Sequence, residues 1–206
     1  PVRLDSVVVS CQHTEEKDLK KLEAEIRKKV LLPALRPLPP DEETKIYINP
    51  SGRFVCGGLD ADTGLTGRKL MVDSYGSMVP HGGGAFSGKD CSKVDLSAAY
   101  MARYIAKNIV AAGLASKCQV SLAYAIGVAQ PVMVQVDTFG TGNVCADDCL
   151  ELAIPLVFGL TPKQIVDTLR LTRPIFRQTA AFGHFGRKEF PWERTDKVEA
   201  LRNAVI

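Results

Sequence analysis

The chain has 206 residues, of which 46% are hydrophobic and 24% charged, an ordinary composition for a globular protein of one large or two small domains. A net charge of +3 is too small to indicate a nucleic-acid partner, and no apolar run has the length of a membrane span. The composition therefore argues against a basic nucleic-acid binder and a helical membrane protein, and we expect neither nucleic acid nor membrane as a partner.

The first fifty residues predict a strand, a helix and a second strand. A β-branched run over 2–10 indicates a buried strand, and Thr14 is expected to cap the helix that follows. Pro33 is expected to end this helix, and 45–48 indicates a short strand. The predicted apolar face of the helix consists of Leu19, Leu22, Ile26 and Val30.

The rest of the chain alternates between turn-rich segments and regular elements. Asp95 is expected to cap a helix that Gly113 ends, and Pro155 is expected to kink or break a later helix. The last forty residues show little periodicity. The expected strands are 68–75, 119–126 and 132–137, and the expected helices are 95–112, 147–158 and 162–170, the last capped by Thr161.

Adjacent strand pairs in this order do not suit a purely parallel sheet. The pattern predicts an α+β fold in which helices cover mixed or antiparallel sheets, and similar strand–helix units leave room for a divergent repeat.

Six cysteines are present, and none forms a C-x-x-C pair. Cys145 and Cys149 are four residues apart, but no neighbouring cysteine pair or histidine completes a zinc set. We therefore expect free thiols and a reducing, cytoplasmic location.

The segment His81–Asp90, which has the sequence HGGGAFSGKD, carries the strongest functional signal. Successive glycines let backbone N–H groups converge on an anion, and Lys89 and Lys93 can each place an ammonium on a phosphate oxygen. Asp95 follows at the expected start of a helix, whose dipole also favours anions. The spacing indicates a polyphosphate-binding loop.

Three alternatives to such a loop fit the segment less well. A standard P-loop requires Ser or Thr where Asp90 stands and an earlier helix start. The oxyanion loop of lipase-like hydrolases requires a G-x-S-x-G elbow, which the sequence lacks. A flexible surface turn with solvated lysines is the simplest alternative, and it leaves the clustering of two lysines and an aspartate unexplained.

A second cluster precedes this loop. Phe54 could stack on a nucleobase, Asp62 could accept a hydrogen bond from a ribose hydroxyl or an amine, and Arg68 and Lys69 place two charges beside a glycine turn. Taken alone, this cluster would indicate no more than a turn-rich connector.

Together these segments resemble the methionine adenosyltransferase (S-adenosylmethionine synthetase) family, in order and over essentially the whole chain. The resemblance lies in 49–55 (NPSGRFV), 64–69 (GLTGRK), 81–90, 92–95 (SKVD), 124–128 (YAIGV), 138–141 (TFGT) and 179–187 (TAAFGHFGR).

The resemblance implies intertwined, pseudo-repeated α+β domains and a homodimer or tetramer with active sites between subunits. It implies transfer of the adenosyl group of ATP to L-methionine, release of tripolyphosphate and its hydrolysis to phosphate and diphosphate, with Mg²⁺ and K⁺ as cofactors. Residues 1–50 would be part of the central domain, and residues 51–206 would supply the remaining central and C-terminal elements.

The resemblance also assigns the site residues. The catalytic set is Arg68, Lys69, Lys89 and Lys93, and Asp95 would hold a magnesium ion. The ATP contacts would be Arg53, Phe54, Asp62, Arg68, Lys69, Ala85 and Lys89, and the methionine contacts would be Asp62, Lys93 and Ile126. His81 is expected only to fix its loop, while His184 and Trp192 are expected to be structural.

Four positions depart from the family pattern: Leu59, Ala61, Cys91 and Leu96. Family members are roughly twice this length, so we expect the chain to lack the N-terminal domain with its share of the site and to be inactive alone. A non-catalytic nucleotide-binding or regulatory subunit is the alternative, although such a homologue would be expected to lose some of Lys69, Lys89 and Lys93.

Overall fold

The structure, a computed structural model, describes residues 2–65 and 67–205. The chain divides into two compact units, Pro1–Gly64 and Leu65–Ile206, and each is described by itself. Thr66, which belongs to the glycine-turn motif 64–69, lies outside the described residues, as do both terminal residues.

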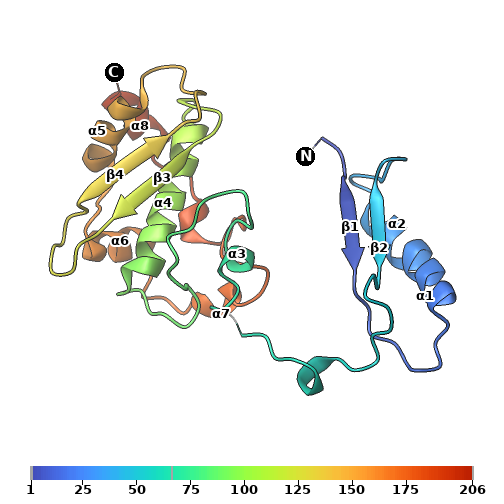
Figure 1. The fold of residues 1–206 in the computed structure, drawn as a ribbon. Helices are drawn as coiled ribbons and strands as arrows, with labels where there is room; N and C mark the ends of the chain where they lie inside the picture. Colours follow the sequence, from blue (N-terminus) through green and yellow to red (C-terminus); the bar gives the residue numbers. More distant parts are fainter. Residues whose placement is uncertain (1, 66, 206) are drawn as a thin grey trace. The chain divides into compact units, whose positions relative to one another are not determined.

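The first unit is a parallel strand pair joined through a helical segment (Figure 1). Strand β1 (Ser6–Val9) pairs with β2 (Lys45–Ile48) in the register Ser6↔Lys45. The connection contains helix α1 (Leu19–Ile26), the π-helical η1 (Arg27–Leu31) and α2 (Leu32–Ala34), which together make the crossover that parallel strands require. Only alternate strand residues are half-buried, so the expectation of a buried first strand is wrong.

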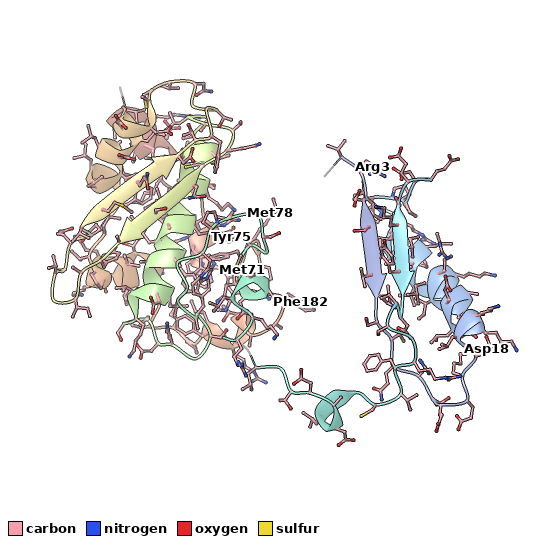
Figure 2. The ribbon with its side chains drawn as sticks, viewed as in Figure 1. Arg3, Asp18, Met71, Tyr75, Met78 and Phe182 are labelled. Atoms are coloured by element: carbon pink, nitrogen blue, oxygen red, sulfur yellow. The ribbon has the colours of Figure 1, made fainter. Side chains whose placement is uncertain are left out.

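The helix boundaries of this unit differ from the prediction. Asp18, not Thr14, caps α1, because its carboxylate accepts the Lys21 N–H at 2.9 Å (Figure 2). The π-turn inserts an extra residue, which rotates the apolar face by one position. Leu31 is therefore buried, whereas Val30 is 52% exposed. Helical structure also continues past Pro33 to the end of α2.

The second unit is built around one long helix and an antiparallel hairpin (Figure 1). Helix α4 (Val94–Ala111) packs against β3 (Gln119–Ala123), and α5 (Asp147–Val157) packs against β4 (Met133–Asp137). The α+β prediction is confirmed. The remaining elements of the chain are η2 (Gly58–Asp60) in the first unit, and α3 (Leu70–Asp73), α6 (Pro162–Leu169), α7 (Phe176–Thr179), η3 (Pro191–Glu193) and α8 (Val198–Ala204) in the second.

Several predicted boundaries hold in the second unit. Thr161 caps α6 in a reciprocal capping box with Gln164, and Gly113 follows the end of α4 at φ +74°. Pro155 does not break α5, which continues through it to Val157.

Two predictions for this unit are wrong, and one helix was not predicted. The helix cap before α4 is Lys93, so Asp95 lies inside the first turn rather than at the cap. Residues 68–75 form the short helix α3 and a turn instead of a strand, because the glycines around them favour turns. The low periodicity near the chain's end concealed α8.

The core of the second unit is rich in stacked aromatic rings. Trp192 is fully buried and stacks on Tyr100, with ring centroids 3.6 Å apart, and on Phe190 at 4.7 Å, as expected of a packing residue. The buried Glu193 carboxylate accepts hydrogen bonds from Arg103 at 2.9 and 3.0 Å and from Lys107 at 2.9 Å. This core gives the loops on its surface a rigid support.

Among the described residues, no single helix is long and apolar enough to cross a membrane. The helices α5 and α6, bent by 76° at the break between them, together have the length and composition of a membrane span, and these two properties are the only ones that they share with one.

Candidate polyphosphate site

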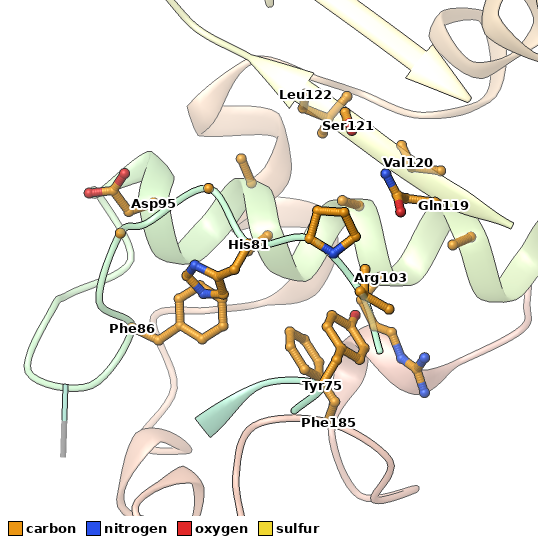
Figure 3. A pocket seen from close by; sticks show the side chains of 18 of the residues that line it. Tyr75, His81, Phe86, Asp95, Arg103, Gln119, Val120, Ser121, Leu122 and Phe185 are labelled. Atoms are coloured by element: carbon orange, nitrogen blue, oxygen red, sulfur yellow. The ribbon is translucent and has the colours of Figure 1, made fainter. Parts of the chain in front are cut away.

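The glycine-rich loop 81–90 leads from the turn after α3 to the start of α4 (Figure 3). Gly83 and Gly88 adopt φ of +90° and +87°, the left-handed region that glycine occupies without strain. The Gly83 N–H donates to His81 Nδ1 at 2.8 Å, which confirms the loop-fixing hydrogen bond expected of His81. The loop is thus held open by its own backbone geometry.

The two lysines of the loop region are each paired with a nearby carboxylate. Lys89 Nζ lies 2.6 Å from Asp95 Oδ2, and Lys93 Nζ lies 2.7 Å from Asp90 Oδ2. The hydrogen bonds from Lys93 and then Ser92 hold the pKa of Asp90 well below its usual range. Both pairs are partly exposed, and such pairs contribute little stability. A polyphosphate can therefore replace the carboxylates as the partner of both ammonium groups at small cost.

The Arg68–Lys69 segment begins beside this loop. A Cβ built on Gly67 would lie 3.5 Å from the Ser87 carbonyl oxygen and 3.6 Å from Ala85 Cβ. Arg68 and Lys69, which follow Gly67 directly, are exposed. Within residues 67–205 the fold thus brings two of the predicted basic segments together at one loop.

The predicted residues of the first unit form local contacts. Arg53 Nη1 donates to the Glu15 carbonyl at 2.6 Å, and the Phe54 N–H donates to His13 Nε2 at 3.0 Å. Asp62 is exposed, and its carboxylate accepts the Thr63 N–H at 2.8 Å. Their participation in one site with the loop stays a prediction.

Ile126, predicted to border a methionine pocket, lies in the turn after β3 and is fully exposed. The four departures from the family pattern divide by burial. Leu96 is 1% exposed and belongs to the core, and Cys91 packs partly against that core. Leu59 and Ala61 are exposed.

A hollow of about 710 Å³ adjoins the loop between α4 and β3 (Figure 3). Its walls include Tyr75, Phe185, successive residues of β3 and the alanine-rich face of α4, with Asp95 at one end. Lys69, Lys89 and Lys93 do not line it. The hollow is mostly apolar, although Arg103 also lines it, so it suits apolar groups better than phosphate, and the candidate phosphate contacts lie on the basic loop beside it.

Among residues 2–65 and 67–205 there is no cluster of three or more His, Cys, Asp or Glu side chains able to hold a metal ion. Asp95 offers a carboxylate beside the glycines of the loop. Mg²⁺ commonly binds through one or two carboxylates and takes its other ligands from water and substrate phosphates. An aspartate next to a phosphate-binding loop therefore fits magnesium, provided that polyphosphate is present.

Three residues support the site in ways that the sequence motifs did not indicate: Asp73, Ser87 and His184. Asp73 accepts the Gly67 N–H at 3.2 Å, and Ser87 Oγ lies 3.0 Å from His184 Nε2. The second contact joins residues 97 positions apart, so no local pattern could have revealed it.

All six cysteines are free thiols, as predicted.

The fold and this loop define an α+β protein with a basic, glycine-rich loop that is a candidate polyphosphate site. Comparison with known proteins gives the family. Residues 56–194 match the C-terminal domain of S-adenosylmethionine synthetase, and residues 1–54 match its central domain. The chain belongs to the S-adenosylmethionine synthetase family, as the sequence motifs indicated.

Two relatives define the extent of the similarity. An S-adenosylmethionine synthase of Treponema denticola is 58% identical over 206 residues, which are 100% of this chain and 53% of the relative. The solved structure of an unusual S-adenosylmethionine synthetase from Campylobacter jejuni has a TM-score of 0.88 and 42% identity, and the match covers 100% of this chain and 55% of that one. The chain therefore spans about half the length of these relatives.

Proposed function

We propose that the chain forms part of an enzyme that transfers the adenosyl group of ATP to methionine, giving S-adenosylmethionine and tripolyphosphate. The observation that carries the proposal is the meeting of the Lys89 loop, Asp95 and the Gly67–Lys69 segment in a member of this family. The methionine sulfur would form a bond to the ribose 5′ carbon as the bond from that carbon to the triphosphate oxygen breaks. A thioether has no proton to lose, so no general base is required.

The barrier to this reaction lies in alignment and in the charge of the leaving group. We assign neutralisation of the triphosphate to Arg68, Lys69, Lys89 and Lys93. Lys89 and Lys93 are held near the loop by their carboxylate partners and would exchange those partners for phosphate oxygens as ATP binds. The same charges would hold tripolyphosphate while it is hydrolysed to phosphate and diphosphate.

The remaining contacts are proposed from the family resemblance. Arg53, Phe54, Asp62 and Ala85 would bind the nucleotide, and Asp62, Lys93 and Ile126 would bind methionine. The half-buried ring of Phe54 could stack on a base only with its open face.

Asp95 is the residue that we propose for Mg²⁺, and K⁺ is proposed as a second ion from the resemblance alone. When bound, magnesium would neutralise phosphate oxygens. This chain's own contribution is to place the Asp95 carboxylate on the first turn of α4, against the backbone of Gly84.

We further propose self-association as a homodimer or tetramer, with sites completed between subunits. Apolar side chains project from the second unit at Met71, Met78 and Phe182, which are 44, 89 and 97% exposed (Figure 2). Large exposed apolar groups of this kind commonly mark interaction surfaces. A cytoplasmic location is proposed from the free thiols, and the division into central-domain residues 1–50 and a remainder 51–206 stays part of this proposal.

The test compares Lys89→Met with Lys163→Met in the intact polypeptide that carries this chain. Lys163 makes an exposed ion pair with Asp167 on α6 and serves as the matched control. We expect Lys89→Met to lower kcat for adenosyl transfer by about 10²–10³-fold, the usual effect of removing one preorganised charge partner. Unchanged turnover would refute the loop assignment, and ATP binding without turnover in the unsubstituted protein would favour a regulatory subunit.

A further inference from the structure

His184 lies at the meeting point of the two basic segments, and the proposed reaction does not use it. It is 1% exposed, and both ring nitrogens have partners: Tyr100 Oη lies 2.6 Å from Nδ1, and Ser87 Oγ lies 3.0 Å from Nε2. A neutral imidazole satisfies both contacts, since one nitrogen donates, the other accepts, and each hydroxyl can do either.

Neighbouring aromatic rings restrict the orientation of the His184 ring. Its edge meets the Phe86 ring at 5.2 Å, and the Tyr100 ring lies on another side at 5.9 Å. The main chain of His184 is also fixed, because its carbonyl accepts the Trp192 indole N–H at 2.8 Å. Nε2 is therefore directed at Ser87 by the aromatic core.

The same residue reaches the Arg68–Lys69 segment through its backbone. The His184 N–H donates to the Asp73 carbonyl at 2.9 Å, and the Asp73 carboxylate accepts the Gly67 N–H at 3.2 Å. Gly67 in turn lies against the Ser87 carbonyl. Three hydrogen bonds thus form a chain, Gly67–Asp73–His184–Ser87, and the close approach of Gly67 to the Ser87 carbonyl closes the circuit.

Two residues of this circuit, Ser87 and Gly67, lie near the cations of the proposed site in the sequence. Lys89 follows Ser87 by two residues, and Arg68 and Lys69 follow Gly67 directly. Ser87 lies in the loop and Gly67 in a turn, outside regular elements that would otherwise fix their spacing. The circuit supplies a preorganised spacing of the binding charges, which lowers the cost of holding a flexible polyanion in one arrangement.

We propose that His184 is a positioning residue, which sets the spacing between the Lys89 loop, through Ser87, and the Arg68–Lys69 turn, through Asp73, for a bound tripolyphosphate group. The inference rests on the proposed function, because it concerns the same site. It adds a residue that holds the site in shape without touching phosphate.

Two amide variants separate positioning from packing. The amide nitrogen of Gln falls near the place of Nε2, so His184→Gln can keep the bond to Ser87. The Asn side chain is shorter, and its amide nitrogen falls near the place of Nδ1. His184→Asn therefore keeps the hydrogen bond to Tyr100 and loses the one to Ser87. Ser87→Ala removes the loop end of the same contact, and Tyr100→Phe removes the opposite hydroxyl as a control.

The experiment is calorimetric titration of the intact polypeptide that carries each variant with sodium tripolyphosphate, with the melting temperature recorded alongside. We expect Ser87→Ala and His184→Asn each to lose roughly tenfold in affinity, the effect of one hydrogen bond. The double variant should lose no more than either single one, since both remove one contact. His184→Gln should restore part of the affinity, and Tyr100→Phe should lower the melting temperature more than the affinity.

Wild-type affinity in Ser87→Ala and His184→Asn would overturn the positioning role. So would losses that follow the melting temperature across all variants, with His184→Gln no better than His184→Asn. Failure of the unsubstituted intact polypeptide to bind tripolyphosphate would count against the proposed function itself, and the two failures are therefore distinguishable.

Discussion

The backbone of Gly84 lies so close to Asp95 that a Cβ on Gly84 would stand 2.6 Å from Cγ of that aspartate. Real Cβ atoms do not approach this closely, so the contact requires glycine. The relationship joins the glycine-rich loop to the first turn of α4 and places the carboxylate beside Lys89.

Gly84→Ala is therefore expected to displace either the loop or Asp95, at a cost of about 1–3 kcal/mol, as for other overpacked sites. Tripolyphosphate affinity should fall with it. Gly82→Ala in the same glycine run is the comparison, because nothing lies within 4 Å of a Cβ at Gly82 and its φ is not positive. Calorimetric titration of both variants checks the ranking, and an equal loss in both would show that loop flexibility, not the Asp95 contact, controls binding.

Asp95→Asn should affect binding with opposite signs in the absence and presence of magnesium. The carboxylate pairs with Lys89 at 2.6 Å and opposes an incoming polyanion, so its removal should tighten metal-free tripolyphosphate binding. The variant should also lose most of the gain in affinity that MgCl₂ gives the wild type. Titrations with EDTA and with MgCl₂ test both signs, and a magnesium effect of wild-type size in Asp95→Asn would remove Asp95 from the metal site.

The pH dependence of stability should report His184. Burial lowers the pKa of His184 below its ordinary value; the Asp73 charge opposes this shift, and the Arg187 charge adds to it. The unfolded chain then binds the proton more readily than the folded one, so His184 contributes stability above about pH 6.5 that is lost as pH falls through its folded pKa. We expect the urea concentration at the unfolding midpoint of the second unit to decrease as the pH is lowered below about 6.5. The decrease per pH unit should be smaller in His184→Gln. Equal slopes in both proteins would mean that the pKa of this imidazole is the same in the folded and unfolded chain.

Much of the second unit can be predicted from sequence because its signals are local. The helical spacing within 95–112, the Thr161 cap and the glycine after α4 each depend on neighbouring residues, and the structure confirms each. The glycine and lysine spacing of the loop is equally local. These features define the basic half of the candidate site.

The features that escape prediction depend on distant contacts or on small changes of helical phase. The π-turn before Leu31 moves the buried face by one residue, which no propensity scale registers. The circuit through His184 and Ser87 depends on tertiary packing. The composition of 68–75 favours a strand, although the hydrogen bond from Gly67 to Asp73 fixes the segment as a short helix and a turn.

The one-residue shift of the buried helix face can be tested by two alanine substitutions in the first unit. Leu31→Ala should destabilise this unit by about 2–4 kcal/mol, because it empties a buried position that is 5% exposed. Val30→Ala should cost less than about 1 kcal/mol, since that side chain is 52% exposed. Urea unfolding followed by circular dichroism measures both losses. A larger loss in Val30→Ala than in Leu31→Ala would mean that the buried face follows the regular α-helical spacing that the sequence predicts.

Glu193 should be among the most sensitive side chains of the second unit. Burial alone would raise its pKa, but hydrogen bonds from Arg103, the Gly186 N–H and Lys107 outweigh burial and lower it. Glu193→Gln removes the charge that neutralises the half-buried guanidinium and ammonium, so we expect a loss of about 3 kcal/mol. The Glu199 side chain is 80% exposed and pairs with Arg202, so Glu199→Gln should change stability by less than about 0.5 kcal/mol.

The contribution of Glu193 to stability should be retained above the ordinary carboxyl pKa and lost as pH falls through the lowered folded value. Unfolding midpoints of the two variants at pH 7 decide the point, and similar midpoints would show that the Glu193 network is solvated rather than structural.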